Sequence, residues 1–338
     1  MYVPVRPIRE WAASGRETPQ ATAAIATPPP AASTPAPEPT PVPTPTPTPT
    51  PFALAWISDT QHYAGSRAEV LNCQYGWIAE ARDRENIVAL VHTGDIVQDC
   101  SSTAQWENVR AADALLPSDL LRVTAAGNHD IGADAAYPMN YLTYLTDTQI
   151  AEGNQFLGGL CRYVTLDAGG IRLLLLSIAY LHETDSIEWA CQVLKEHPGC
   201  FAILLAHSYL MPTLNGGHRD GYTSGGAILR DNVVRPSPNL RMVLCGHTRG
   251  SVSRPLFCDD DGDGVEDRQV YQLLLNFQDE DSGMAGFLRL IRFDTAAGRI
   301  EVTTYSPYED RFGYPGDPLG AIYVIEDVDF SEYIIRAS

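Results

Sequence analysis

The chain has 338 residues and a formal net charge of -19 at pH 7, with 25 prolines and seven cysteines. This charge repels nucleic acids and anionic membranes, so no surface for binding either is expected, and any anionic substrate must be held by local metal ions or arginines. No stretch is long and apolar enough to cross a bilayer, and residues 1–15 lack the continuous apolar run of a signal peptide.

The N-terminal segment, residues 1–51, is rich in alanine, threonine and proline and ends in a proline–threonine alternation. Proline has no backbone N–H, so this segment can neither form a hydrogen-bonded ladder nor bury a core. We expect a disordered linker, followed by one large domain over residues 52–338. A linker of this kind suits an exported protein, and we therefore expect an extracellular or cell-envelope location.

The seven cysteines lack the short paired spacing of a zinc ribbon or a redox motif, so a thiolate metal site is not expected. Disulfides are plausible in an exported protein. The pairs that we consider are Cys73 with Cys100 and Cys191 with Cys200. The alternative is that all seven are ordinary buried thiols.

The domain begins with strands that are each followed by polar residues. Apolar runs typical of strands are Phe52–Ser58, Ile87–His92 and Leu121–Ala125, and helical spacing of apolar residues covers Glu69–Asp83 and Ala104–Leu116. The three strands lead directly to Asp59, Asp95 and Asn128. Open α/β sheets bind ligands at the carboxyl ends of their strands, so we expect these side chains to lie close together.

The second half of the domain repeats this pattern. A hairpin of Arg162–Asp167 and Ile171–Ile178 is expected, then a helix over Ser186–Glu196, then the strands Phe201–Ala206, Leu240–Cys245, Gln269–Phe277, Gly286–Phe293 and Arg299–Tyr305. Two of these strands end at a histidine, His207 and His247 respectively. A single histidine after a strand is usually structural, but two in this order favour a metal site.

The most distinctive segment is Gly127-Asn128-His129-Asp130. Gly127 lets the backbone turn closely, Asn128 offers an oxygen to a cation, and His129 can hold or give a proton near neutral pH. Asp130 can orient the His129 imidazole. Taken alone, the tetrapeptide could equally be a polar turn that caps a strand.

The strand ends together carry an ordered series: Asp59, Asp95, Asn128-His129-Asp130, His207 and His247. This series resembles the calcineurin-like metallophosphoesterase family, whose motifs are Asp-x-His, Gly-Asp, Gly-Asn-His-Asp or Glu, a later His, and Gly-His-x-His. The resemblance covers about residues 53–307, and residues 272–278 and 304–307 resemble the tail of its bacterial and secreted members. It implies an α/β fold in which two mixed β-sheets form a sandwich flanked by helices.

The resemblance also implies two adjacent divalent ions, which manganese, iron or zinc would suit. Asp95 would bridge them, with Asp59 and Gln61 on the first ion and three further ligands on the second: Asn128, His207 and His247. A hydroxide held between the ions would attack phosphorus. His129, held by Asp130, would stabilise the transition state or protonate the leaving oxygen.

Two positions depart from the family pattern. Gln61 stands where the first motif has a histidine, and Arg249 stands where the last motif has its second histidine. A glutamine oxygen binds metal weakly and a guanidinium not at all, so we expect a weak first site, with Arg249 contacting phosphate oxygens instead. His62 points to the other face if the strand continues, and we do not expect it to substitute.

Two classes of function follow from the sequence. The leading interpretation is a metal-dependent phosphoesterase that acts outside the cytoplasm on a small phosphomonoester or phosphodiester. The alternative, favoured by Gln61 and Arg249, is a weakly active or non-catalytic module that keeps one metal and binds an anion. Substrate choice would lie in loops such as Leu214–Gly226.

A second candidate metal site lies in an acidic segment late in the chain. Its five ligand positions match a calcium loop: Asp259, Asp261, Asp263, Val265 through its carbonyl, and Asp267. The closing glutamate is absent, because Val270 occupies its place. Calcium here would be structural, and the alternative is a solvated acidic loop.

Overall fold

The computed structural model describes residues 49–132, 138–145, 154–180, 184–212, 221–278 and 285–335, all of which belong to one unit. Residues 1–48 of the expected linker and residues 214–220 of the loop Leu214–Gly226 lie outside the described residues. Within the described ranges, no helix combines the length and the apolar character needed to span a membrane.

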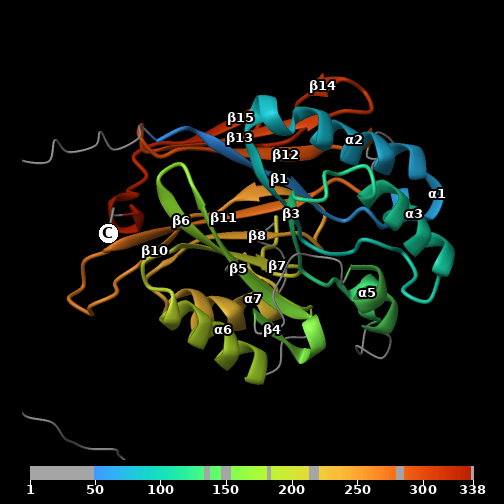
Figure 1. Cartoon of the computed structure of the whole chain (residues 1–338). Coiled ribbons are helices and arrows are strands. Elements are labelled where there is room, and N and C mark those ends of the chain that lie inside the picture. Colours follow the sequence, from blue (N-terminus) through green and yellow to red (C-terminus); the bar gives the residue numbers. More distant parts are fainter. Residues whose placement is uncertain are drawn as a thin grey trace, which may run out of the picture. The chain divides into compact units, whose positions relative to one another are not determined.

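The first sheet is mixed and has the order β14-β13-β12-β1-β2-β3, with β15 beside β13 (Figure 1). Its strands are β1 (Phe52–Ile57), β2 (Ile87–His92), β3 (Leu121–Thr124), β12 (Leu288–Asp294), β13 (Arg299–Ser306), β14 (Arg311–Phe312) and β15 (Ile322–Ile325). β1, β2 and β3 are parallel neighbours, and β12 pairs with β1 antiparallel. The carboxyl ends of β1, β2 and β3 therefore meet at one edge, as the sequence predicted.

The second sheet is also mixed and has the order β10-β11-β8-β7-β6-β5-β4, with β9 beside β11. Its strands are β4 (Gln155–Phe156), β5 (Cys161–Ala168), β6 (Ile171–Ile178), β7 (Phe201–Ala206), β8 (Leu240–Cys245), β9 (Gly250–Ser253), β10 (Leu256–Cys258) and β11 (Arg268–Asn276). β6, β7, β8 and β11 run parallel, while β5 and β6 form the predicted hairpin.

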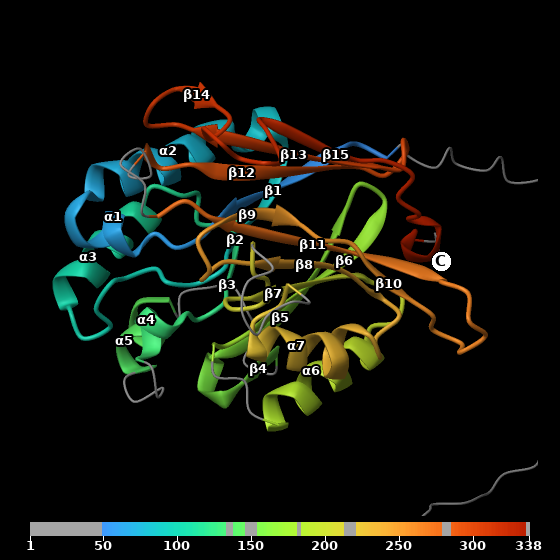
Figure 2. The same cartoon turned by 180° about the vertical axis from the view of Figure 1, so that it is seen from behind.

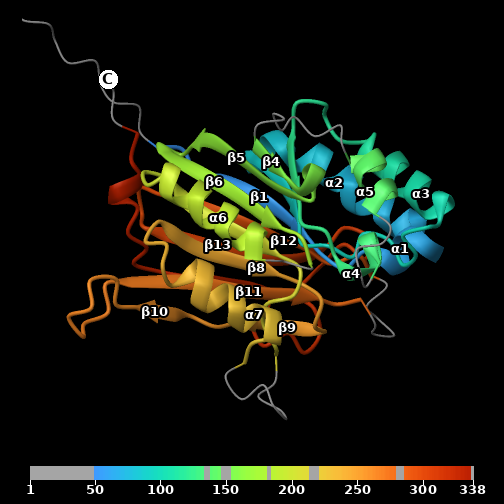
Figure 3. The same ribbon diagram turned by 90° about the horizontal axis from the view of Figure 1, so that it is seen from below.

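The two sheets pack face to face, with helices on both outer faces (Figures 1 and 2). The helices are α1 (Gln61–Ser66), α2 (Ala68–Glu85), α3 (Thr103–Asp113), α4 (Asn128–Ile131), α5 (Pro138–Leu145), α6 (Thr184–Glu196), α7 (Ser224–Leu229) and the π-helix η3 (Arg230–Val234), and the short 3-10 turns are η2 (Leu157–Gly159) and η5 (Ser331–Tyr333). One apolar cluster lies between the sheets, and one lies under the helices on each side. This is the predicted α/β sandwich, seen from below in Figure 3.

Burial explains why the central strands carry apolar residues without alternation. Every residue of β1, β7 and β8 is buried, because each strand is covered by the opposite sheet on one face and by helices on the other. The Trp56 side chain of β1 faces the cluster between the sheets, and its neighbour Ile57 faces the helices.

The sequence correctly predicted the long elements but missed several short ones. α1, α4, α5, α7, β9, β10, β14 and β15 were not expected, because each offers too few residues to show a period. The chain does not continue as a strand past Asp59. It turns into α1 at Gln61, so the alternation argument applied to His62 is wrong.

All seven cysteines are free thiols, which contradicts the two disulfides considered from the sequence. The thiol of Cys191 lies on α6 and donates a hydrogen bond to the carbonyl of Asn232, 3.1 Å away, rather than meeting Cys200. Cys73 lies on the exposed face of α2, whereas Cys100 is half-buried in the loop before α3. The thiols are therefore better explained as ordinary side chains than as a covalent framework.

Candidate metal centre

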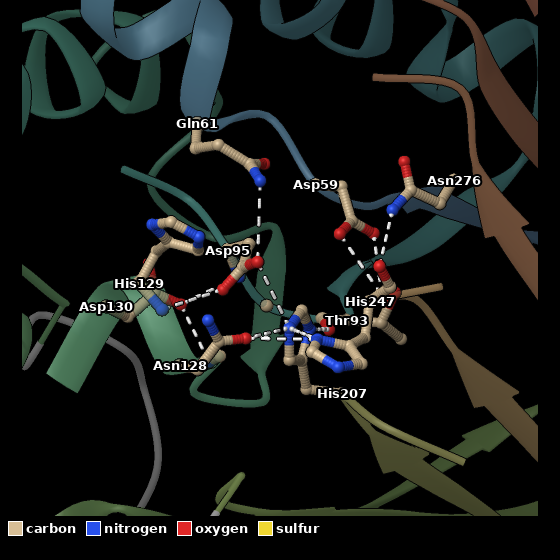
Figure 4. Close-up of polar contacts among 12 residues, drawn as sticks. Asp59, Gln61, Thr93, Asp95, Asn128, His129, Asp130, His207, His247 and Asn276 are labelled. Atoms are coloured by element: carbon tan, nitrogen blue, oxygen red, sulfur yellow. Dashed lines mark hydrogen bonds and ion pairs between the residues drawn. The ribbon is translucent and has the colours of Figure 1, made fainter. Parts of the chain in front are cut away.

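Four polar side chains converge where β2, β3, β7 and β8 end. The Nε2 atom of His207 lies 3.2 Å from Asp95 Oδ2 and 3.1 Å from Asn128 Oδ1. The Nδ1 atom of His247 lies 3.0 Å from Asn128 Oδ1 and 3.2 Å from His207 Nε2 (Figure 4). The structure thus brings together the four residues predicted to bind the second ion.

The tautomer of neutral His207 is fixed by its other ring nitrogen. His207 Nδ1 lies 2.7 Å from the carbonyl oxygen of Thr93, which can only accept, so Nδ1 carries a hydrogen. In the neutral ring, Nε2 then presents a lone pair to the acceptor atoms around it. Such an arrangement of a backbone carbonyl behind a metal-binding histidine orients the ring and raises its basicity.

Acceptor atoms that face one another repel unless a proton or a metal ion lies between them. Ligands bound about 2.0–2.2 Å from a tetrahedral zinc lie roughly 3.3–3.6 Å apart, slightly farther than the 3.0–3.2 Å seen among these four residues. Two imidazoles, a carboxylate and an amide oxygen form a mixed donor set for a borderline divalent ion. The residues present therefore fit a metal ion.

The charges in the ion-free cluster agree with this reading. Burial opposes a proton on His207, but the charge and hydrogen bond of Asp95, the charge of Asp59 and the Thr93 carbonyl together outweigh it and raise the pKa of His207 to about 9. Burial alone would raise the pKa of Asp95, yet His207 holds it below its usual value. Burial and the charge of His207 lower the pKa of His247 to about 4, so this ring is neutral and free to bind metal. A metal ion thus competes with a proton on His207.

Asp59 and Gln61 lie next to this cluster, at the predicted first site (Figure 4). The Asp59 carboxylate accepts hydrogen bonds from the Ser58 hydroxyl at 2.6 Å and from the backbone N–H of His247 at 3.1 Å. Burial, together with the nearby charge of Asp95, raises the pKa of Asp59 to about 8. A metal ion bound beside Asp59 would lower this pKa and favour the carboxylate.

The loops that carry the ligands are backbone-strained. Asp59, Asp95 and His247 have φ angles of 52°, 54° and 65°, in the left-handed region that residues other than glycine rarely adopt. Strain of this kind persists only where the surrounding structure enforces it, and it concentrates at functional sites. A Cβ atom at Gly127 would lie 2.3 Å from the Asp95 side chain, and one at Gly246 would lie 2.3 Å from Asp59. These glycines make room for the two carboxylates.

A chain of hydrogen bonds reaches Asp59 from the core between the sheets. The Trp56 indole donates to the Thr93 hydroxyl at 3.0 Å, which donates to the Ser58 hydroxyl at 2.6 Å, and Ser58 donates to Asp59. Because an ionised carboxylate can only accept, Ser58 uses its one hydrogen on Asp59, and Thr93 therefore donates to Ser58. Thr93 and Ser58 could not be recognised as site residues from the sequence, since single hydroxyls beside a motif form no pattern.

His92 contacts both the loop that carries Asp95 and the loop that carries Asp59. Its Nδ1 atom accepts the backbone N–H of Gly94 at 3.0 Å, and its Nε2 atom lies 3.0 Å from the Thr60 hydroxyl. Burial lowers the pKa of His92 to about 3, so the ring is neutral and Nε2 carries its hydrogen. His92 thus connects the turn before Asp95 to the turn after Asp59.

Asp130 does not orient His129, and this part of the sequence prediction is wrong. The buried Asp130 carboxylate accepts four backbone N–H groups, those of Asp95, Ile96, Val97 and Gly127, at 2.7–3.2 Å. Burial and the charge of Asp95 raise the pKa of Asp130 to about 7, although its N–H donors favour the carboxylate. Asp130 therefore shapes the loop that carries Asp95.

His129 is positioned by the backbone instead. Its Nδ1 atom lies 2.8 Å from the carbonyl oxygen of Gln98, and its backbone N–H donates to Asp95 Oδ1 at 2.9 Å. The ring is half-buried. Since the carbonyl requires a hydrogen on Nδ1, the Nε2 atom is the one left to exchange a proton with a ligand.

Arg249 is exposed. Burial, His129 and Arg249, in that order, lower the pKa of His62, so His129 and Arg249 each lie within electrostatic range of His62. The structure thus places the permanent positive charge of Arg249 in the region of His62, next to the candidate first site.

A cleft of about 490 Å³ opens beside His247. Its lining residues are mostly small and polar: Tyr180, Ser208, Met211, Thr223, Ser224, Gly225, His247 and Thr248. The Tyr180 ring packs against His207 and His247 with centroid separations of 5.8 and 5.4 Å. Asn276 donates to the carbonyl of His247 at 3.0 Å and so fixes the loop after β8. The sequence indicated neither Tyr180 nor Asn276 individually.

The acidic segment forms an exposed loop between β10 and β11. Carboxylate oxygens of Asp259, Asp261 and Asp267 lie within 4.8 Å of one another, a spacing that allows a shared ion. The carboxylates of Asp259, Asp261 and Asp263 accept backbone N–H groups inside the loop, and Asp260 pairs with Arg268 at its base. Calcium binding by this loop stays a prediction.

Comparison with known proteins agrees with the fold and the motif series. The sequence profile of the family described as calcineurin-like phosphoesterase matches residues 52–249. The chain belongs to this family, which confirms the resemblance found in the sequence. The uncharacterised protein YvnB of Bacillus subtilis (strain 168) is 34% identical over 275 residues, which cover 80% of this chain and 21% of YvnB. The chain thus spans about a fifth of the length of this relative.

Solved structures with the same fold include two with low sequence identity. Purple acid phosphatase PPD1 from yellow lupin (Lupinus luteus) seeds is 13% identical, with a TM-score of 0.56, and the match covers 84% of this chain and 55% of the lupin chain. GAP50, described as the anchor in the inner membrane complex of Plasmodium, is 13% identical, with a TM-score of 0.50 and coverage of 85% and 90% respectively. These likenesses confirm the two-sheet architecture.

Proposed function

We propose that this domain hydrolyses esters of phosphoric acid with the help of two divalent ions. The observation that carries the proposal is the cluster of Asp95, Asn128, His207 and His247, whose potential ligand atoms lie 3.0–3.2 Å from one another. Membership of the calcineurin-like phosphoesterase family supports it. When bound, the ions supply a water of lowered pKa and neutralise phosphate charge.

Asp95 has the position of a bridging ligand. Its Oδ2 atom lies 3.2 Å from His207 on one side and 3.4 Å from the Gln61 amide on the other. Its Oδ1 atom accepts the N–H of His129. The Oδ2 atom of Asp95 thus faces both candidate sites. The Oδ1 atom holds the backbone of His129, the residue assigned to proton transfer.

His129 is the residue that we assign to proton transfer. The Gln98 carbonyl holds Nδ1, so a protonated His129 presents its Nε2–H to a leaving oxygen. Arg249, which lies within electrostatic range of His62, is suited to forked hydrogen bonds with phosphate oxygens, which would offset charge that a weakly held first ion does not neutralise.

The substrate that we propose is a small phosphomonoester or phosphodiester. The cleft beside His247 offers hydroxyl groups, including Ser208 and Thr248, for the alcohol part of the ester. The proline–threonine tract before residue 52 supports an extracellular or cell-envelope location for this reaction.

The test is hydrolysis of aryl phosphate monoesters and diesters by the purified full chain. The protein is stripped with a chelator and then supplied with manganese, zinc or iron, with Asp95→Asn as the control for contaminating phosphatases. We expect metal-dependent turnover that the control lacks. Metal-loaded protein without turnover on either class of ester would refute the proposal.

A second candidate function is a non-catalytic module that holds one metal and binds an anion. It is favoured by Gln61 and Arg249, which replace two histidines of the family pattern. In that case the chain would bind one ion and inorganic phosphate, and Arg249→Ala would weaken phosphate binding in a protein that hydrolyses no ester. The same preparations distinguish the two functions.

A further inference from the structure

The side-chain amide of Gln61 can be oriented from its surroundings. Gln61 is 2% exposed and begins α1. With its nitrogen towards Asp95 Oδ2, the amide makes one long hydrogen bond of 3.4 Å and leaves its oxygen against other acceptors. Turned by 180°, the nitrogen donates to the carbonyl oxygens of Asp59 at 2.9 Å and Asp95 at 3.0 Å. The second orientation satisfies the buried amide better.

In this orientation the Gln61 oxygen accepts from the Gln278 side chain and lies 3.4 Å from Asp95 Oδ2. Oxygens that share an octahedral ion at about 2.1–2.4 Å lie roughly 3.0–3.4 Å apart. The second lone pair of the Gln61 oxygen and the Asp95 carboxylate are therefore close enough to share a cation.

The surrounding loops hold this amide in place. The Gln278 side chain contacts the Gln61 amide. The backbone N–H of Gln278 donates to Asn276 at 3.0 Å, and Asn276 in turn donates to the His247 carbonyl. The loop after β11 therefore connects the Gln61 amide to the loop after β8.

Asp59 completes the set of oxygen donors. It is 2% exposed and is oriented by Ser58 and by the backbone of His247. No imidazole of the family pattern remains on this side, since Gln61 and Arg249 stand at the two histidine positions. Carboxylate and amide oxygens suit magnesium and manganese, whereas imidazoles suit zinc and iron.

We propose that the two ion sites differ in chemistry: Asp59, Gln61 and Asp95 form an oxygen-only site for a hard ion such as Mg²⁺ or Mn²⁺, beside an imidazole site for Zn²⁺ or Fe²⁺. The proposal rests on the proposed function only in taking Asp95 as the shared ligand. On this proposal, Gln61 and Arg249 cause the two sites to select different metals, because they stand where the family pattern has histidines. The domain then holds two different metals.

The test is metal content, independent of turnover. The full chain is stripped with a chelator and dialysed against zinc alone, manganese alone, or both, and bound metals are counted by mass spectrometry. Manganese is also followed by electron paramagnetic resonance. We expect one tight zinc equivalent with zinc alone, and one zinc plus one manganese when both are present. Two equally tight zinc ions in the parent protein would overturn the proposal.

Two substitutions test the part played by Gln61. Gln61→Ala should weaken manganese binding at least about tenfold and leave zinc binding unchanged. Gln61→His should admit a second tight zinc. Gln192→Ala, a substitution on the exposed face of α6, is the matched control and should change neither ion. Manganese binding that is unchanged in folded Gln61→Ala would also refute the proposal.

The two proposals fail in different ways. If zinc and manganese divide as expected but no phosphate ester is cleaved, the proposed function is wrong and the metal assignment stands. If esters are cleaved by a protein that holds two identical tight ions, the function stands and the metal assignment is wrong.

Discussion

Replacing Asp130 with asparagine should destabilise the domain, because this carboxylate satisfies four buried backbone N–H groups. Oδ1 accepts from Ile96 and Val97, and Oδ2 accepts from Asp95 and Gly127. Asparagine keeps one oxygen and puts an NH₂ group at the other position. Whichever way the amide turns, two N–H groups lose their acceptor and face another donor.

The magnitude follows from the number of donors left unsatisfied. Each buried donor without a partner costs about 1–3 kcal/mol, so two cost about 2–6 kcal/mol. Domains are typically stable by about 5–15 kcal/mol, so a large fraction of the stability is lost. Because the loop also carries Asp95, metal binding should weaken as well.

The assay is urea unfolding of the metal-stripped chain, followed by circular dichroism. Asp167→Asn is the control, since Asp167 forms an exposed ion pair with Arg172 on the second sheet and should cost at most about 1 kcal/mol. If Asp130→Asn unfolds at the same urea concentration as the parent protein and only turnover falls, the structural role assigned to Asp130 is refuted. That result would instead support a role for Asp130 in orienting His129.

The remaining predictions concern the ions and the proton donor. Asp95→Asn should lose both ions and activity, and full metal occupancy by mass spectrometry would contradict a bridging role. His129→Ala should retain both ions while kcat falls about 10²–10⁴-fold, and an unchanged kcat would exclude it as the proton donor. Arg249→Ala should mainly raise KM, and Arg249→His should bring zinc into the first site; unchanged kinetics and metal content in both would remove Arg249 from the site. Millimolar calcium should raise the melting temperature, and Asp261→Ala should abolish the rise; no shift in the parent protein would leave a solvated acidic loop.

The sequence predicted most of the site because each ligand follows a strand with a clear apolar run. Asp59, Asp95, Asn128, His207 and His247 could be placed from strand ends alone. The structure brings Asp95, Asn128, His207 and His247 into one cluster, with Asp59 beside it. The rule that parallel strands present their carboxyl ends at the same edge brings together the ligands within each sheet, and the family resemblance predicted that the two sets meet.

What the sequence could not predict are the contacts that depend on geometry within a loop. Asp130 is next to His129 in the chain, yet its carboxylate turns inwards to backbone N–H groups because four of them converge there. The turn at Thr60 starts a six-residue helix too short to show a period. The orientation of the Gln61 amide depends on carbonyl oxygens that come together only after folding.

The ligands of the second ion come from both sheets, and this affects when the ion can be acquired. Asp95 and Asn128 follow strands of the first sheet, while His207 and His247 follow strands of the second. The first sheet also needs β12, which pairs with β1 and is made more than 200 residues later in synthesis.

A growing chain therefore lacks a finished site until β12 has left the ribosome. If the protein is exported unfolded, it carries no ion across the membrane with it. The metals in the site are then those available where the chain folds, and the composition of that compartment, rather than of the cell that made the protein, sets its loading.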